Sequence, residues 1–292
     1  MNRLAGKVLV VIGGTSGLGL SAAKAFVAEG AQVVIVGRDA AKVAAAEKEL
    51  GKSALGVVGD ATEPSTASAA IATAVNKFGG FHGLYHVAGG SGRRKGDGPL
   101  HELTDEGWEF TLRENLTSMF YSNRAAVQQF LKQATGGSVL NMGSVLGVAP
   151  SPRYFATHAY ATTKAAIIGL TKSAAAHYAG ANIRFNVLAP ALVATPMSQR
   201  AQGDDEVMLF IQTKQPLDGG RIGKPEDLDG AAVYFLSDES KFATGQVLAV
   251  DGGWCVSEGQ VPQRAEVGQP RATGESVFTS LGKLWGKLTG GK

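Results

Sequence analysis

A tyrosine and a lysine four positions apart are the residues of this chain best suited to moving a proton. Tyr160 and Lys164 stand in the run Tyr-Ala-Thr-Thr-Lys, a spacing that puts both side chains on one face of a helix. A free phenol, with a pKa of about 10, is a poor acid or base at neutral pH. A cation about 4 Å away favours the phenolate by roughly 4 kcal/mol, or about three pKa units before desolvation works against it. We therefore predict that Lys164 lowers the pKa of Tyr160 and makes it a general acid and base.

A glycine-rich turn near the start of the chain is typical of a dinucleotide site. Residues 13–19 read Gly-Gly-Thr-Ser-Gly-Leu-Gly and lie between a predicted strand, Lys7–Ile12, and a predicted helix, Gly17–Glu29. Glycines let the backbone approach a pyrophosphate, whose charge the free N–H groups of a helix start favour. The spacing differs from G-x-G-x-x-G, so a purely structural turn remains the alternative. The predicted cofactor contacts in this turn are Gly13, Thr15, Ser16, Gly17, Leu18 and Gly19.

The end of the second predicted strand favours one nicotinamide cofactor over the other. An acidic residue there usually binds the ribose 2′-hydroxyl of NAD. Here the strand ends Val-Gly-Arg-Asp, and Arg38 offers a planar cation suited to a 2′-phosphate. We predict NADP, with NAD as the alternative and a solvated helix-start charge as the bland interpretation of Arg38. Asp60, just after the third strand, is placed to meet the adenine edge or to form a turn.

Short apolar runs that alternate with alanine-rich amphipathic stretches must position these residues. Runs that are apolar on both faces suit strands buried between two helical layers. The alternation predicts an α/β fold: one Rossmann-type domain over residues 1–254, with a doubly wound, seven-stranded parallel sheet and helices on both faces. The predicted strands are Lys7–Ile12, Gln32–Gly37, Ala54–Val58, Gly83–Val87, Gly137–Met142, Ile183–Ala189 and Gln246–Val250. The predicted helices are Gly17–Glu29, Asp39–Leu50, Glu63–Phe78, Thr104–Ala134, Ala159–Tyr178 and Lys224–Leu236.

Composition excludes several classes of protein. Hydrophobic residues make up 44% of the chain and charged residues 18%, a globular rather than a disordered balance. Forty glycines among 292 residues are about twice the usual share, but no G-X-Y period accompanies them, which excludes collagen. A net charge of +3 is too small for a nucleic-acid footprint. The single cysteine, Cys255, cannot form an intrachain disulfide, and no metal site is predicted.

The chain changes character after Trp254. Residues 255–292 are predicted to be a C-terminal extension, with a flexible Gly- and Pro-rich arm and a possible short amphipathic helix over Phe278–Leu288. We expect that helix to dock on the protein's own oligomer; a membrane surface and a disordered tail are the alternatives. No secretory signal and no membrane-spanning apolar run is found, so we expect a cytoplasmic protein.

Taken together, the glycine turn, Tyr160, Lys164, Ser144 just beyond a strand, and Asn115 resemble the short-chain dehydrogenase/reductase family. Further stretches look like the same family: residues 37–43, 184–197 and 223–254. The resemblance covers about residues 5 to 254 and implies hydride transfer between NAD(P)H and a carbonyl or alcohol. It also implies a homo-tetramer or homo-dimer that packs through the long helices.

The resemblance also implies a role for each matching residue. Tyr160 is the general acid and base, and Lys164 lowers its pKa and holds the nicotinamide ribose. Ser144 polarises the substrate oxygen, and Asn115 holds a water in a proton relay behind Lys164. Asn115, Tyr160 and Lys164 are implied cofactor contacts as well. The remaining ones are Ala61, Ala88, Gly89, Pro190, Val193 and Thr195.

Four positions depart from the family pattern. Ile12 stands where the family usually has Thr, and Ala191 where it has Gly after Pro190. The usual Asn-Asn-Ala-Gly after the fourth strand is His86-Val87-Ala88-Gly89 here. The last departure puts contacts on the adenosine side and in the central sheet in doubt, but none touches the proton chemistry.

The substrate pocket is expected where three segments converge beyond the carboxyl ends of the strands. They are residues 91–99, with Arg93, Arg94 and Lys95; residues 148–158, with Arg153 and His158; and residues 197–220, long enough to act as a lid. The basic groups suggest an anionic substrate or carrier such as a phosphopantetheine thioester; a solvated basic loop is the alternative.

We therefore predict an NADP-dependent oxidoreductase acting on a small-molecule carbonyl or secondary alcohol, of the 3-oxoacyl-thioester or sugar/polyol type. An NAD-dependent dehydrogenase is the second enzyme hypothesis. A non-catalytic NAD(P)-binding sensor or scaffold is the alternative from another class, and loss of Tyr160 or Lys164 would have favoured it.

Overall fold

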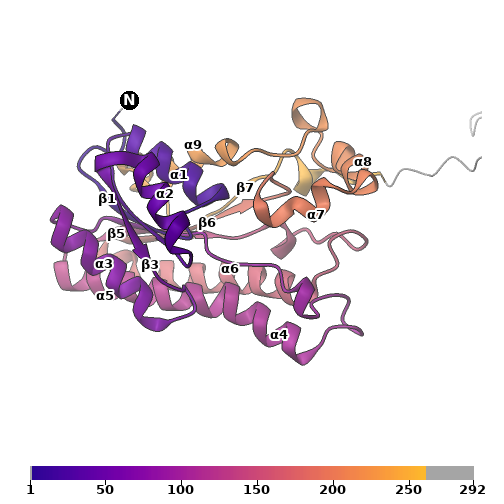
Figure 1. Ribbon diagram of the computed structural model, residues 1–292, viewed down its shortest axis with the longest axis horizontal. Helices are drawn as coiled ribbons and strands as arrows, with labels where there is room; N and C mark the ends of the chain where they lie inside the picture. The colour runs from indigo at the N-terminus through magenta and orange to yellow at the C-terminus, as the bar shows by residue number, and fades with distance from the viewer. Residues whose placement is uncertain (1, 261–292) are drawn as a thin grey trace, which may run out of the picture. The chain divides into compact units, whose positions relative to one another are not determined.

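The computed structural model describes residues 2–260, and the predicted tail helix Phe278–Leu288 lies outside them. Its centre is a parallel sheet of seven strands in the order β3-β2-β1-β4-β5-β6-β7 (Figure 1). This sheet confirms the predicted fold class. The strands are β1 Val8–Ile12, β2 Gln32–Gly37, β3 Ala54–Val58, β4 Gly83–His86, β5 Gly137–Met142, β6 Ile183–Pro190 and β7 Val247–Val250.

Two layers of helices cover the sheet, as Figure 1 shows. The apolar side chains of α1, α2 and α9 form one core with the sheet, and those of α3, α5 and α6 form the other. Strands β1 and β2 are buried on both faces, which explains their continuous apolar runs. The helices are α1 Gly17–Ala28, α2 Ala40–Leu50, α3 Pro64–Phe78, α4 Asp105–Leu112, α5 Ser118–Gln133, α6 His158–Tyr178, α7 Gln199–Gln202, α8 Asp205–Lys214 and α9 Asp229–Leu236.

The structure departs from the predicted elements at three places. The predicted helix Lys224–Leu236 is a 3-10 turn, Pro225–Leu228, followed by α9, Asp229–Leu236. The predicted helix Thr104–Ala134 is interrupted between α4 and α5 by a π-helical turn, Arg113–Thr117. The predicted lid, residues 197–220, contains α7 and α8. Asp204 caps helix α8, because its carboxylate accepts hydrogen bonds from two backbone N–H groups. The helix buries Val207, Phe210 and Ile211 on one face.

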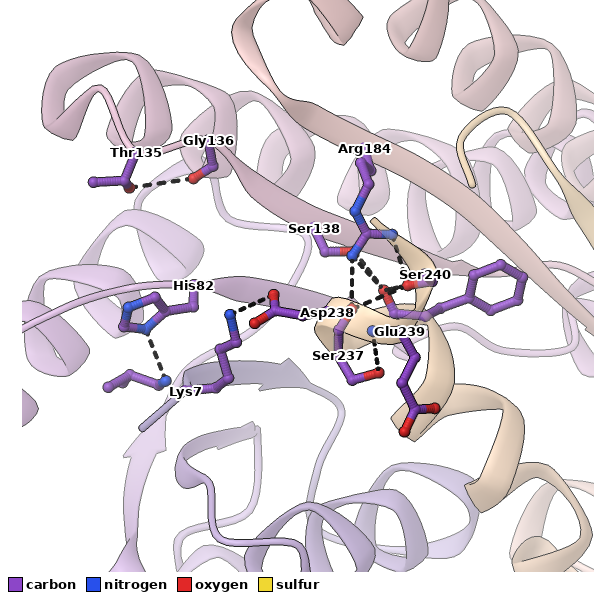
Figure 2. A network of polar contacts seen from close by, with 12 residues as sticks. Lys7, His82, Thr135, Gly136, Ser138, Arg184, Ser237, Asp238, Glu239 and Ser240 are labelled. Atoms are coloured by element: carbon purple, nitrogen blue, oxygen red, sulfur yellow. Dashed lines mark hydrogen bonds and ion pairs between the residues drawn. The ribbon is translucent and has the colours of Figure 1, made fainter. Parts of the chain in front are cut away.

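The amino ends of the strands are held by a cluster of charged and polar residues that we call the amino-edge cluster: Lys7, Ser138, Arg184, Asp238 and Ser240 (Figure 2). The Arg184 guanidinium on β6 donates to Ser240 Oγ at 2.8 Å and to the Phe235 carbonyl at 2.9 Å. It also donates to the carbonyls of residues 243 and 237. Ser138 Oγ on β5 donates to the Phe235 carbonyl as well, and Lys7 pairs with Asp238 at 2.7 Å. These contacts tie the end of α9 to the sheet.

The chain divides into one unit, Met1–Val261, which holds the whole sheet, and a second unit, Pro262–Lys292, which lies outside the described residues. The domain boundary at residue 254 stays a prediction. Within residues 2–260, no helix combines the length and the apolar character needed to cross a bilayer. In the same part of the chain, no group of three or more His, Cys, Asp or Glu side chains could hold a metal ion.

Candidate active site

A cavity of about 400 Å³ opens beyond the carboxyl ends of the strands. The strand order reverses between β1 and β4, and the cavity lies over this switch point, where ligands of open parallel sheets bind. Its lining comes from the ends of β1 to β6 and from the segments that follow them. All of the predicted catalytic residues border it: Asn115, Ser144, Tyr160 and Lys164.

The glycine turn between β1 and α1 forms one wall of the cavity. Gly13 has a φ of +88°, and a Cβ there would lie 2.7 Å from the Ala88 nitrogen, so this position requires glycine. Ser16 precedes α1 at the N-cap position, but its side chain accepts no hydrogen bond from the helix, which leaves the first N–H groups open to an anion. Gly19 does not border the cavity; a Cβ there would lie 2.1 Å from the Gly13 carbonyl oxygen, so its glycine serves the tight turn.

Three charged residues surround the end of the cavity where the adenosine is predicted to bind. The Arg38 guanidinium lies 3.5 Å from the Glu114 carboxylate and 3.9 Å from that of Asp60. Its side chain is two-thirds exposed, so the pairs are weak and the cation stays accessible to a phosphate. A Cβ at Gly37 would lie 2.5 Å from the Thr15 side chain, so the glycine lets the second strand approach the turn. Glu114 is a neighbour that the sequence did not single out.

Tyr160 lies in the first turn of α6, and a residue distant in the sequence holds that turn. The buried carboxylate of Asp97 accepts from the Ala159 N–H and from the Tyr160 N–H, each at 3.0 Å. Asp97 follows β4 and lies more than sixty positions before the helix it caps. Burial raises the pKa of the Tyr160 phenol to about 12, and the hydrogen bond with the Ser144 side chain works in the opposite direction.

Lys164 lies one turn further along α6, almost fully buried. Its ammonium donates to the Met142 carbonyl at 2.9 Å and lies 5.4 Å from the centre of the Tyr160 ring. Burial lowers the pKa of Lys164 to about 8. The expected lowering of the Tyr160 pKa by Lys164 is not found in this structure, where burial raises the pKa of the phenol. The two groups are nevertheless brought together at the cavity as predicted.

Asn115 lies in the π-helical turn, a feature often found at functional sites. Its amide donates to the Gly90 carbonyl and to the Thr111 carbonyl, both at 2.9 Å, and accepts from the Gly90 N–H. A Cβ at Gly89 would lie 2.6 Å from the Asn115 amide oxygen. The glycine therefore allows the loop after β4 to lie against Asn115 and Lys164.

His86 shows how this chain accommodates its departure from the family pattern. The ring is fully buried, with Nδ1 2.7 Å from Ser122 Oγ and Nε2 3.1 Å from the Ala88 carbonyl oxygen. Burial and the charge of Lys164 lower the pKa of His86 to about 3, so the imidazole is neutral and Nε2 donates to the carbonyl. Helix α5 thus supplies the polar partner that this side chain needs.

The predicted substrate segments line the cavity only in part. Arg93 and Arg200 border it, whereas Arg94, Lys95, Arg153 and His158 do not. Lys95 pairs with Glu106, and Arg153 pairs with Glu206. The rest of this end of the cavity is largely apolar, and its apolar members are Val145, Leu146, Phe155, Leu192, Met197, Ala201 and Trp254.

The predicted cofactor contacts converge on the same cavity, with Gly19 as the exception. Those that border it are Gly13, Thr15, Ser16, Gly17, Leu18, Arg38, Asp60, Ala61, Ala88, Gly89, Pro190, Val193 and Thr195. Sequence reasoning missed Asp97 and Arg200. A lone acid and a lone arginine in predicted loops carry no spacing signal that would have found them.

Comparisons with known proteins identify relatives of this chain. A family model described as enoyl-(acyl carrier protein) reductase matches residues 13–255. The chain is 36% identical over 258 residues to a 2,5-dichloro-2,5-cyclohexadiene-1,4-diol dehydrogenase of Sphingobium indicum, which covers 87% of this chain and 98% of the relative. It is 39% identical over 254 residues to a 3-alpha-(or 20-beta)-hydroxysteroid dehydrogenase of Mycobacterium tuberculosis; these residues are 86% of this chain and 90% of the relative.

Two further proteins are similar over most of their length. An NADP-dependent (R)-specific alcohol dehydrogenase of Lentilactobacillus kefiri is 35% identical over 257 residues, which are 87% of this chain and 98% of the relative. A solved short-chain type dehydrogenase/reductase from Mycobacterium ulcerans has a TM-score of 0.80 and 31% identity, covering 87% of this chain and 91% of that one.

Proposed function

Because the chain belongs to the short-chain dehydrogenase/reductase family, we propose that this oxidoreductase transfers a hydride between NADP(H) and the carbonyl or secondary alcohol carbon of a small molecule. The observation that carries the proposal is the placement of the Tyr160 phenol, the Ser144 hydroxyl and the Lys164 ammonium around one cavity at the switch point of the sheet. The uncapped start of α1 and the close approach at Gly13 fit a pyrophosphate.

NADP(H), when bound, supplies or accepts the hydride. Tyr160 donates its proton to the carbonyl oxygen during reduction and removes a proton from the hydroxyl during oxidation. Ser144 hydrogen-bonds the same oxygen and orients it. Lys164 has donors left over after its bond to Met142, so it can hold ribose hydroxyls while its charge favours the phenolate. Asn115, fixed by two carbonyls, is proposed to hold a water behind Lys164.

Among the predicted substrate types, the cavity wall favours an apolar carbonyl compound over a sugar. Phe155, Leu146 and Trp254 border the substrate end, and they offer a polyol few hydrogen bonds. The relatives named above act on a cyclic diol, a hydroxysteroid and an alcohol, which is consistent with that preference.

The preference for NADP is proposed from Arg38. The guanidinium lies beside Glu114 and Asp60 at the rim, and a 2′-phosphate can take the place of these weak partners. An NAD-dependent enzyme remains the second candidate, because Asp60 and Glu114 could instead accept from ribose hydroxyls. We also propose that the protein acts in the cytoplasm as a homo-tetramer or homo-dimer.

The test is oxidation of NADPH and NADH at 340 nm over a panel of ketones, 3-oxoacyl thioesters and keto sugars. Turnover with NADPH that falls at least about 10²-fold in Tyr160→Phe, but not in Tyr178→Phe on the same helix, would support the proposal. Faster turnover with NADH would favour the NAD alternative. If neither cofactor is consumed although one binds, the sensor or scaffold hypothesis gains.

A further inference from the structure

Two arginines from different segments meet at the substrate end of the cavity. Arg93, in the loop after β4, donates to the Tyr154 carbonyl at 3.1 Å, and Arg200, on α7, donates to the same oxygen at 3.4 Å. Both border the cavity, and Arg93 is half-buried. Sharing one carbonyl brings two positive groups together, and the charge of Arg200, after burial, lowers the pKa of Arg93.

Within residues 2–260, neither arginine has a carboxylate within ion-pairing distance. The charge of Asp97 raises the pKa of Arg93. However, both carboxylate oxygens of Asp97 accept hydrogen bonds from backbone N–H groups of α6. In contrast, Arg38, Arg113 and Arg153 each lie against a carboxylate. The cavity arginines therefore keep most of their N–H donors for a ligand.

The carbonyl that the two arginines share is held in place. Tyr154 donates its phenol proton to the Glu206 carboxylate at 2.9 Å, and Arg153 binds the same carboxylate at 2.6 Å. The Tyr154 ring also packs on Phe210 of α8, with centroids 5.0 Å apart. The loop and helix α8 are thus joined, and Glu206 neutralises Arg153 rather than Arg93 or Arg200.

We propose that Arg93 and Arg200 bind an oxyanion head of the substrate: a carboxylate, sulfonate or phosphate at the far end of an apolar compound whose carbonyl or alcohol reaches Tyr160. The proposal rests on the proposed function. Guanidinium groups bind planar and tetrahedral oxyanions through paired, charge-assisted hydrogen bonds, and a site already lined by apolar and aromatic side chains selects the body of such a molecule.

The experiment compares methyl-ketone acids from 4-oxopentanoate to 8-oxononanoate with their methyl esters. The series varies the distance between the ketone, which must reach Tyr160, and the carboxylate, which must reach the two arginines. Arg93→Gln and Arg200→Gln remove the charge but keep an amide donor for the Tyr154 carbonyl. Arg94→Gln is the matched control, because Arg94 is exposed and lies outside the cavity lining. The corresponding sulfonates distinguish a tetrahedral head from a planar one.

We expect kcat/KM for the best acid to fall about 10- to 100-fold in Arg93→Gln and in Arg200→Gln, with the ester changed less than about threefold. Arg94→Gln should change neither. Equal losses for acid and ester, or no loss for either, would overturn the proposal. A matching loss of NADPH affinity would also overturn it, because the arginines would then serve the cofactor.

Calorimetric binding of the same acids and esters to the NADP⁺ complex separates this proposal from the proposed function. If nothing is turned over, yet the acid binds more tightly than its ester and loses that advantage in Arg93→Gln, the oxyanion site stands and the reaction does not. If acids bind no better than esters, or do not bind, the site is overturned whatever the turnover.

Discussion

The two ends of the sheet use cations in opposite ways. At the amino edge, the Arg184 guanidinium donates to four acceptors, and the neighbouring Lys7 pairs with Asp238 (Figure 2). At the carboxyl edge, the buried Lys164 ammonium donates to one carbonyl, and Arg93 and Arg200 share another. Because a donor already paired has nothing to offer a ligand, we interpret the amino-edge cluster as structural and the cavity cations as ligand-binding.

The largest effect that would sharpen this contrast is expected from Lys164→Met. Removing the cation beside Tyr160 should lower kcat by about 10²- to 10⁴-fold, because the phenolate loses its partner and a ribose contact disappears. The folded state should lose no stability, since Met fills a similar volume without a buried charge. Steady-state rates and urea unfolding measure both quantities. If Lys164→Met were as active as the parent, the contrast between structural cations at the amino edge and functional cations at the cavity would be wrong.

Arg184→Met should have the opposite effects: a loss of stability and little change in kcat. Four hydrogen bonds of the guanidinium at the amino edge are lost, so the free energy of unfolding should fall by about 3 kcal/mol. Turnover per folded molecule should stay within about twofold, because the residue lies at the far end of the sheet from Tyr160. Chemical denaturation at neutral pH, with active-site titration of the folded fraction, tests this. A large loss of kcat in fully folded protein would contradict it.

The pH dependence of stability also distinguishes Lys164 from Arg184. The pKa of Lys164 falls from an ordinary 10.5 in the unfolded chain to about 8 in the folded protein. The unfolded chain therefore binds more protons between these values, and folding becomes more favourable as pH rises through that window, by up to about 3 kcal/mol. Arginine stays charged throughout, so Arg184 adds no such slope.

The measurement is the free energy of unfolding of the parent and of Lys164→Met from pH 7 to pH 10. The Met variant should be the more stable of the two at pH 7, and the difference should shrink toward pH 10. Parallel curves would show that Lys164 is not the titrating group.

The smallest predicted effect concerns Asp97, whose two carboxylate oxygens accept from backbone N–H groups of α6. Asp97→Ala should lower the free energy of unfolding by about 1–2 kcal/mol, because two N–H groups of α6 lose their acceptor. It should also lower kcat about five- to tenfold, since the cap holds the turn that carries Tyr160. Asp97→Asn keeps one acceptor oxygen and should recover part of the rate.

Asp39 is the matched control for that prediction. It caps α2 through two backbone N–H groups on the exposed side of the molecule. Asp39→Ala should therefore cost a similar amount of stability without changing kcat. If both variants lowered kcat equally, Asp97 would have no special role in positioning Tyr160.

Much of the fold could be predicted from the sequence because the strands are apolar on both faces. Runs such as Gln32–Gly37 and Gly137–Met142 agree with β2 and β5 residue for residue. Helices α7 and α8 were not predicted, because they are short and α8 buries only one narrow face against the cavity segments. The π-helical turn also escaped, since its residues have the same periodicity as the helices on either side.

The candidate site was predictable where spacing brings residues together, and not where folding does. Tyr160 and Lys164 share a helix, so their proximity follows from four residues of separation. The Lys164 bond to Met142 and the burial of the phenol do not follow from that spacing, and the burial reverses the expected direction of the Tyr160 pKa. Asp97 and Arg200 are brought to the site by contacts between residues distant in the sequence, which no local sequence pattern predicts.

The π-helical turn at Arg113–Thr117 also sets the phase of α5. One extra residue in a turn advances everything after it by about 100° around the helix axis. That rotation decides which side of α5 meets the sheet, and it carries Ser118 and Ser122 to the ring of His86. Deleting a single residue from this turn would therefore rotate the whole of α5 about its axis. Its buried polar groups would leave His86, and its apolar face would at the same time turn away from the sheet.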